Sequence, residues 1–123
     1  MLVCNDAFNI TGPPNTEAVK KYGGYDISYP RLAIIDGEWD PWRPATPHAF
    51  GYGAKNRPST VSEPFLMISE AVHHYDENGL FWNQTKPDLP PYPVAETQST
   101  EVIFVTEWLQ EYAAQKVKKQ YKD

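Results

Sequence analysis

The stretch Arg31-Leu-Ala-Ile-Ile-Asp-Gly-Glu-Trp-Asp-Pro-Trp42 decides the fold of this chain. It begins with a short apolar run, residues 31–35, that lacks polar alternation, as is typical of a strand covered on both faces of a parallel sheet. The run stops abruptly at Asp36-Gly37, a turn-forming pair. We therefore expect a buried strand that carries a cluster of acidic and aromatic side chains at its carboxyl end.

Residues 65–68, Phe-Leu-Met-Ile, form a second apolar run and predict a second buried strand, which leads directly into His73-His74. The prolines and glycines of residues 39–64 predict a long loop between the two strands. Ligands of open α/β sheets gather at the carboxyl ends of parallel strands. Both the acidic cluster and the histidines are therefore expected at such ends.

The rest of the chain frames these two strands. Residues 1–30 carry Gly-Pro, Gly-Gly and Tyr-Pro pairs and predict an irregular connector, with a short helical candidate at 16–22. Residues 86–93 contain four prolines, which remove backbone donors, so this segment is predicted to be a spacer.

A C-terminal amphipathic helix is predicted from residue 100 onward. Apolar residues recur there at helical spacing, and Ser99 or Thr100 is available as the N-cap, with Glu101 in the first turn. Lysines near the far end complement the helix dipole. The residues of the predicted stripe and of the basic end are Val102, Val105, Leu109, Tyr112, Ala113, Lys116, Lys118, Lys119 and Lys122.

Composition limits the classes of function. The chain has 123 residues, 41% of them hydrophobic, which fits a single domain. Its net charge of −5 argues against nucleic acid as a partner, because phosphate binding needs a cationic surface. No apolar stretch approaches the roughly 18 residues of a membrane span, and residues 1–11 lack the pattern of a signal peptide. The single cysteine, Cys4, cannot close a disulfide within the chain.

The first polar cluster holds three carboxylates, Asp36, Glu38 and Asp40. They repel one another unless each is solvated or paired with a cation. Asp40 precedes a proline and lies between two indoles, Trp39 and Trp42, that can shield it from water. It could serve as an acid in catalysis, or it could initiate an ordinary Asp-Pro turn flanked by packing aromatics.

The second polar cluster contains two adjacent histidines, His73 and His74, in the stretch His-His-Tyr-Asp. Adjacent side chains on an extended chain point in opposite directions. At most one of the two histidines is therefore expected to be catalytic.

Two alternatives remain open for this cluster. In the first, one histidine packs and the other is exposed, while Asp76 and residues 78–79 form the next turn. In the second, one histidine binds a metal ion together with His48, Asp36 or Asp76. No spacing of a known metal motif is present, and no metal or cofactor is expected.

Taken together, a carboxylate after one strand and a histidine after the next match the last two members of a Ser, Asp, His triad of the α/β-hydrolase type. In such a triad the histidine acts as general base. The carboxylate fixes the histidine tautomer and stabilises the imidazolium that forms.

Residues 31–76 resemble the C-terminal part of the serine carboxypeptidases that include lysosomal Pro-X carboxypeptidase, dipeptidyl peptidase II and thymus-specific serine protease. The resemblance rests on Asp-Gly-Glu-Trp-Asp-Pro-Trp and Ala-Val-His-His-Tyr-Asp, where that family has Asn-Gly-x-x-Asp-Pro-Trp and Ala-His-His-x-Asp. It implies that Asp40 is the triad acid and His73 the general base. Tyr22-Gly-Gly and the proline-rich loop resemble fungal members. The candidate supporting neighbours are Asp36, Trp39, Trp42 and His74.

The chain departs from the family pattern in three ways. Asp36 stands where the family usually has Asn, and its negative charge could raise the pKa of Asp40. The acid and the histidine, 33 positions apart, are farther apart than in the mammalian enzymes. No Gly-x-Ser-x-Gly motif occurs, and no serine of the chain lies in a predicted strand-to-helix elbow.

The resemblance therefore implies the C-terminal portion of an α/β-hydrolase fold with an incomplete sheet. Residues 31–123 would hold its last buried strands and C-terminal helix, as one partial domain. The nucleophilic serine would lie upstream of Met1, in a missing N-terminal part that is the expected partner of the chain. We expect the isolated chain to be inactive. The alternative is a non-catalytic truncated homologue with a binding or structural role.

The resemblance also implies substrates and surroundings. The expected substrates are peptides cleaved by an exopeptidase next to proline, and the parent enzyme is expected to be secreted, lysosomal or vacuolar. In that setting Cys4 is a candidate for a disulfide with the missing part. Asn9 and Asn83 begin glycosylation sequons. The oligomeric state is not predicted.

Overall fold

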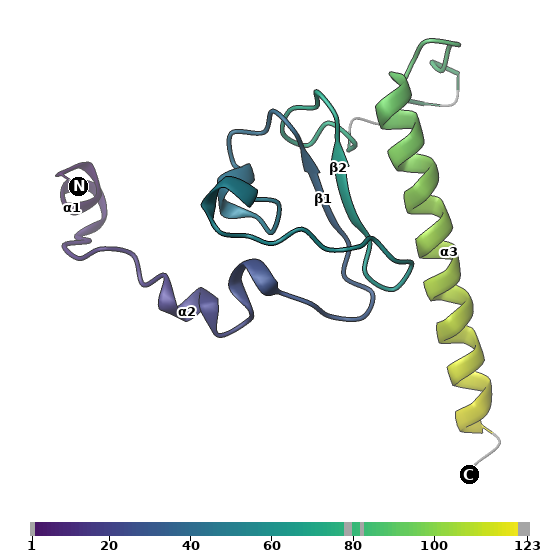
Figure 1. The fold of residues 1–123 in the computed structure, drawn as a ribbon, viewed down its shortest axis with the longest axis horizontal. Coiled ribbons are helices and arrows are strands. Elements are labelled where there is room, and N and C mark those ends of the chain that lie inside the picture. The colour runs from purple at the N-terminus through teal and green to yellow at the C-terminus, as the bar shows by residue number, and fades with distance from the viewer. Residues whose placement is uncertain (1, 78–79, 82, 121–123) are drawn as a thin grey trace.

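Two short strands form the centre of the structure, a computed structural model that describes residues 2–77, 80–81 and 83–120. Strand β1 (Ile34–Gly37) pairs in parallel with β2 (Phe65–Ile68), with Ile34 opposite Phe65 and Gly37 opposite Ile68 (Figure 1). The predicted second strand and the parallel pairing are confirmed. Both strands end at the same edge of the sheet.

Strand β1 lies farther along the chain than the run at 31–35 that predicts it. Arg31 has a left-handed backbone, with φ of 66°, which does not fit an extended strand. At the other end, Asp36 pairs its backbone with Met67 inside the sheet. A carboxylate is tolerated there because its side chain finds a buried partner, described below. The strand therefore continues through the Asp-Gly pair that was predicted to end it.

Residues 38–64 connect the two strands without any further strand or α-helix. The connection contains two 3₁₀ turns, at Arg43–Ala45 and Phe50–Tyr52. Its middle folds back onto β2, so His48 and two alanines of the loop are buried. The buried apolar residues of the described chain are Ala49, Ala54, Phe65, Ile68, Ala71, Val94 and Phe104.

The long helix α3 (Tyr92–Gln120) runs alongside β2 and continues past the sheet (Figure 1). It begins earlier than the sequence predicts, because Pro93 lies in the first turn, where a missing N–H costs nothing. The hydroxyls of Ser99 and Thr100 donate to the carbonyls of Ala95 and Glu96 inside the helix. The prediction that either residue is the N-cap is therefore wrong.

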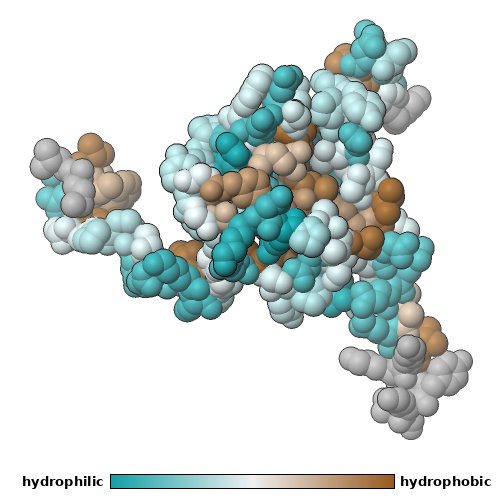
Figure 2. Space-filling view, viewed as in Figure 1, coloured by the Kyte–Doolittle hydropathy of each residue, from teal (hydrophilic) through white to brown (hydrophobic). Residues whose placement is uncertain are grey.

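The face of α3 that packs on the sheet also differs from the predicted stripe. The buried residues are Val94, Thr97 and Phe104, which recur at helical spacing. The predicted stripe is exposed instead, as Val102 and Leu109 illustrate, and exposed apolar side chains lie along α3 (Figure 2). The helix thus has two apolar faces, of which the sheet covers one. The side chains of Lys118, Lys119 and Lys122 lie outside the described residues.

The predicted connector contains two short helices, α1 (Leu2–Phe8) and α2 (Glu17–Lys20), and lies to one side of the sheet (Figure 1). Residues 3–23 are all exposed. The connector meets the long loop where the Tyr25 hydroxyl donates to the Pro44 carbonyl at 2.8 Å. Among the described residues, no helix is long and apolar enough to cross a membrane.

Candidate active site

The three carboxylates at positions 36, 38 and 40 each have a different partner. Asp36 pairs with His48, Glu38 with the turn after β2, and Asp40 with His73. The repulsion expected among three close carboxylates is thus relieved by separation as well as by pairing.

Asp40 and His73 form the first pair. The Asp40 Oδ2 lies 2.8 Å from the His73 Nδ1. The acid side chain is 6% exposed, whereas the imidazole is 47% exposed. Among the described residues the imidazole's other nitrogen, Nε2, has no hydrogen-bond partner. The pair therefore consists of a buried acid and an imidazole whose outer nitrogen is accessible.

Tight backbone packing brings these two residues together. The Trp39 N–H donates to the Ala71 carbonyl at 2.9 Å, so the chain after β1 lies against the chain just before His73. A Cβ on Gly37 would lie 2.5 Å from the Ala71 oxygen and 2.7 Å from the Val72 oxygen. Only glycine permits this approach. The two segments that follow the strands are thus held in contact by the absence of a side chain at position 37.

The pKa of Asp40 is shifted by opposing effects. Burial of the carboxyl works to raise the pKa, but hydrogen bonds from the His73 ring and from the Trp42 N–H hold it below its ordinary value. The expectation that Asp36 raises this pKa is wrong, because the Asp36 carboxylate is directed to His48 instead. Asp40 is therefore ionised at neutral pH and can orient the imidazole.

The second pair, Asp36 with His48, was not predicted from the sequence. The Asp36 Oδ2 lies 2.6 Å from the His48 Nδ1, and the two side chains are 10% and 2% exposed. The imidazole stacks on Phe65 with ring centroids 3.8 Å apart and meets Phe50 edge-on. The sequence signal was weak, because a single histidine in a proline-rich loop is equally consistent with a metal ligand or a surface residue.

Glu38 joins the end of β1 to the turn after β2. Its Oε2 accepts hydrogen bonds from the Glu70 N–H at 2.9 Å and from the Ser69 hydroxyl at 3.1 Å. The same two bonds, with the backbone N–H first, lower the pKa of Glu38. Glu70 itself has a left-handed backbone. Glu38 therefore fastens this turn and does not reach His73 through any bond of the described chain.

His74 lies against His73 rather than on the opposite side. Its φ of 55° turns the chain, so the argument from an extended backbone fails, and the two imidazoles meet edge-on with centroids 3.8 Å apart. The His74 Nδ1 lies 2.9 Å from the Glu77 Oε1. This bond, aided by the charge of Glu77, raises the pKa of His74. The two histidines thus have different acidic partners.

The remaining candidates lie farther from the pair. Trp39 and Trp42 are mostly exposed, and Trp42 contributes its backbone N–H to Asp40 at 2.8 Å. Cys4 is exposed within α1. Asn9 and Asn83 are both exposed. The predicted turn at 78–79 lies outside the described residues.

No metal centre is formed in the part of the chain that the structure describes. It contains no group of three or more His, Cys, Asp or Glu side chains that could hold a metal ion. Of the three ligands that the metal alternative offered beside His73 or His74, two, His48 and Asp36, are bonded to each other. That pair is separate from the one formed by His73.

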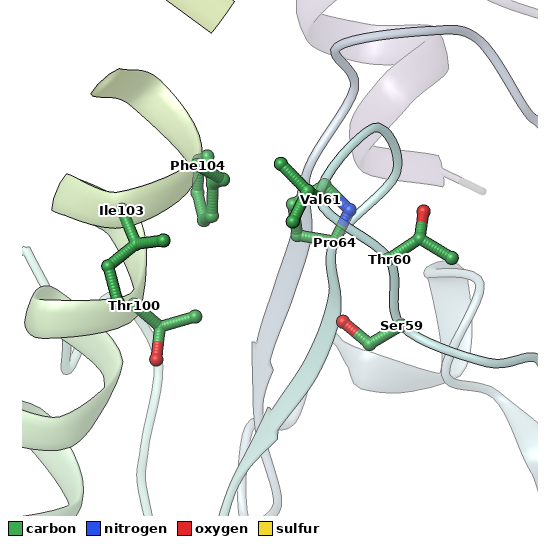
Figure 3. Close-up of a pocket in the computed structure, with 7 residues that line it drawn as sticks. All are labelled: Ser59, Thr60, Val61, Pro64, Thr100, Ile103 and Phe104. Atoms are coloured by element: carbon green, nitrogen blue, oxygen red, sulfur yellow. The ribbon is translucent and has the colours of Figure 1, made fainter. Parts of the chain in front are cut away.

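A cavity of about 320 Å³ lies between the loop that precedes β2 and helix α3. The loop at 59–64, with Ser59, Thr60, Val61 and Pro64, faces Thr100, Ile103 and Phe104 of α3 across it (Figure 3). This loop precedes the amino end of β2, whereas Asp40 follows the carboxyl end of β1 and His73 follows the carboxyl end of β2. The cavity is therefore not next to the candidate catalytic groups.

Comparisons with known proteins give one informative similarity. The chain is 48% identical, over 107 residues, to a probable extracellular serine carboxypeptidase of the fungus Arthroderma benhamiae. The aligned region covers 87% of this chain and 15% of that protein, so the chain spans a small part of the length of its relative. No protein-family model matches the chain. No solved structure matches it either.

Proposed function

We propose that the chain supplies the acid and the general base of a serine-type exopeptidase. The single observation that carries the proposal is the 2.8 Å contact between the Asp40 Oδ2 and the His73 Nδ1, with the outer imidazole nitrogen left open. Similarity to a serine carboxypeptidase supports the same assignment. The parallel strands β1 and β2, with α3 beside them, are compatible with a portion of an α/β-hydrolase domain.

The geometry assigns a role to each nitrogen of His73. With Nδ1–H donated to Asp40, the neutral ring presents the lone pair of Nε2 toward solvent. A serine hydroxyl at that position would lose its proton to Nε2 as the oxygen attacks the peptide carbonyl. The imidazolium, stabilised by the Asp40 carboxylate, would then return the proton to the leaving amine. Hydrolysis of the acyl-enzyme would repeat the same proton transfers with water.

The nucleophile belongs, in this proposal, to sequence outside the chain. The acid and base arrive without a Gly-x-Ser-x-Gly elbow, and the relative is several times longer than this chain. The partner is therefore the N-terminal part of the same enzyme, and the chain alone is inactive. Turnover of a proline-containing peptide by the pure chain, above that of a His73→Ala control, would contradict this.

The finer assignment follows the motifs. Resemblance to the Pro-X carboxypeptidase and dipeptidyl peptidase II family supports peptides cleaved next to proline as substrates. The relative is named extracellular, which supports secretion of the parent enzyme. In that environment the exposed Asn9 and Asn83 are candidate glycosylation sites, and the exposed Cys4 is a candidate for a disulfide with the missing part.

The test uses the full-length enzyme that contains this chain. A fluorophosphonate probe should label it, because the probe reacts only with an activated serine. Asp40→Asn should lower turnover by about 10⁴-fold, as neutralising the acid does in serine proteases. The matched control is Asp88→Asn, an exposed aspartate of the spacer, which should leave turnover unchanged. Absence of labelling in the folded enzyme would favour the binding or structural role, and near-normal activity of Asp40→Asn would contradict the assignment of Asp40 as the acid.

A further inference from the structure

The buried Asp36–His48 pair joins strand β1 to the loop that carries Asp40. Its side chains join the last part of β1 to the middle of the long connection, 12 residues later. Asp40 lies between them in the chain. The pair therefore closes a loop around the candidate catalytic acid.

A continuous series of hydrogen bonds runs from Asp40 to His48. The Asp40 carbonyl accepts from the Arg43 N–H at 3.1 Å, and the Arg43 carbonyl accepts from both the N–H and the hydroxyl of Thr46, each at 3.0 Å. The hydroxyl oxygen of Thr46, Oγ1, in turn accepts from the His48 N–H at 3.2 Å. The ring of bonds returns to β1 through Asp36, next to Gly37.

The acid is also fixed from the strand side. The Asp40 N–H donates to the Gly37 carbonyl at 3.1 Å, and its Oδ1 accepts from the Trp42 N–H at 2.8 Å. His48 further contacts the second strand, because its ring stacks on Phe65 at the start of β2. The same imidazole thus contacts the loop that presents the acid and the strand whose continuation presents His73.

We propose that His48 is a positioning residue: its hydrogen bond to Asp36 closes the ring of bonds that holds the Asp40 carboxylate where His73 meets it. The proposal rests on the proposed function only in calling Asp40 and His73 catalytic. His48 is buried and does not touch the accessible nitrogen of His73, so it acts through Asp40. A role in core packing alone would leave the Asp40–His73 contact unchanged when His48 is removed.

The experiment reads the tautomer of His73 directly, by ¹⁵N NMR of the imidazoles in the 123-residue chain. In the parent chain, the bond to Asp40 should place the proton of the neutral ring on Nδ1. His48→Ala should remove this preference. Thr46→Ala should weaken the preference, because it removes the Oγ1 that accepts from the His48 N–H. Thr46→Ser keeps the hydroxyl and should retain the preference.

Thr60→Ala is the matched control for general loss of stability. Like Thr46→Ala, it removes a hydroxyl that accepts a backbone N–H, here that of Glu63 at 3.0 Å, in the loop before β2. It should leave the His73 tautomer unchanged. If His48→Ala fails to fold, the comparison of Thr46→Ala with Thr46→Ser decides the matter.

Two results would overturn the proposal. An unchanged His73 tautomer in folded His48→Ala, or in Thr46→Ala, would reduce His48 to a packing residue. An equal change in Thr60→Ala would show that any loss of stability has the same effect. Failure of the proposed function is distinguishable from both, because it would appear as the absence of fluorophosphonate labelling in the folded full-length enzyme, whatever the tautomer of His73.

Discussion

The two His–Asp pairs use the same atoms and differ in the exposure of the imidazole. In each, an Nδ1 meets an Oδ2, at 2.6 Å for His48 with Asp36 and at 2.8 Å for His73 with Asp40. The His48 ring is stacked inside the core, whereas nearly half of the His73 side chain is accessible to solvent. The buried pair can contribute to stability but cannot meet a substrate, and the accessible pair can do both. Exposure, more than the pairing itself, separates a structural dyad from a candidate catalytic one.

The largest expected effect is on activity and concerns only the accessible pair. His73→Ala in the full-length enzyme should lower turnover by at least about 10⁴-fold, because the general base is lost. The midpoint of urea unfolding should fall less than in His48→Ala, because Asp40 keeps its hydrogen bond from the Trp42 N–H and the lost side chain is about half exposed. Measuring turnover and the urea midpoint in the same variant checks whether the accessible pair serves activity more than stability. A larger loss of turnover in His74→Ala than in His73→Ala would show that His74, and not His73, is the general base.

The second effect is on stability and concerns the buried pair. His48→Ala leaves the Asp36 carboxylate buried without its partner, which should lower the free energy of unfolding by about 3 kcal/mol. Urea denaturation of the chain, followed by circular dichroism, measures the change. His73→Ala is the reference variant. Equal losses in the two variants would remove the distinction between the pairs.

The third effect comes from the close approach at Gly37. Gly37→Ala forces the backbone of residues 71–72 away from β1, and overpacking of this kind should cost about 2 kcal/mol. The shift should also separate Asp40 from His73 while leaving the buried pair intact, which NMR of the two imidazoles can report. Gly51→Ala is the matched control, because a Cβ there meets nothing within 4 Å. A similar cost in both variants would contradict the steric argument.

The smallest effect is the pH dependence of the Asp40 interaction. The pKa of Asp40 is lower in the folded chain than in the unfolded chain, so its contribution to stability is complete above the ordinary carboxyl range and is lost as the pH falls through the folded value. The difference in unfolding free energy between the parent chain and Asp40→Asn should therefore shrink below about pH 4. Urea midpoints at a series of pH values measure this. A gap that stays constant in acid would contradict the lowered pKa.

The sequence predicts the parts of the fold that depend on local apolar runs. Residues 65–68 form a strand at the predicted positions, and the parallel pairing follows from two unalternating runs. The exposed stripe of α3 shows the limit of such arguments. Periodicity identifies apolar faces, but a helix with two of them does not reveal which face the sheet will cover.

The site shows a similar division. The meeting of Asp40 with His73 was predictable, because each follows a buried strand and carboxyl ends of parallel strands share an edge. The Asp36–His48 pair was not, because it depends on how a proline-rich loop folds back over β2. The indoles of Trp39 and Trp42 were expected to shield the acid, yet both are mostly exposed, and the bond from Trp42 to Asp40 comes from its backbone N–H. Contacts made by loops depend on tertiary packing that no local pattern encodes.

The parallel pairing of β1 with β2 has an entropic consequence for the order of these contacts. Parallel strands need a long crossover, and fixing its ends reduces the freedom of everything between them. Asp36 and His48 are 12 residues apart, and Asp40 and His73 are 33 residues apart. By the logarithmic dependence on loop length, the shorter closure costs about 0.9 kcal/mol less. The bond from the buried His48 to Asp36 therefore divides the long connection between β1 and β2 into shorter loops. This lowers the entropy that remains to be lost when His73 docks on Asp40.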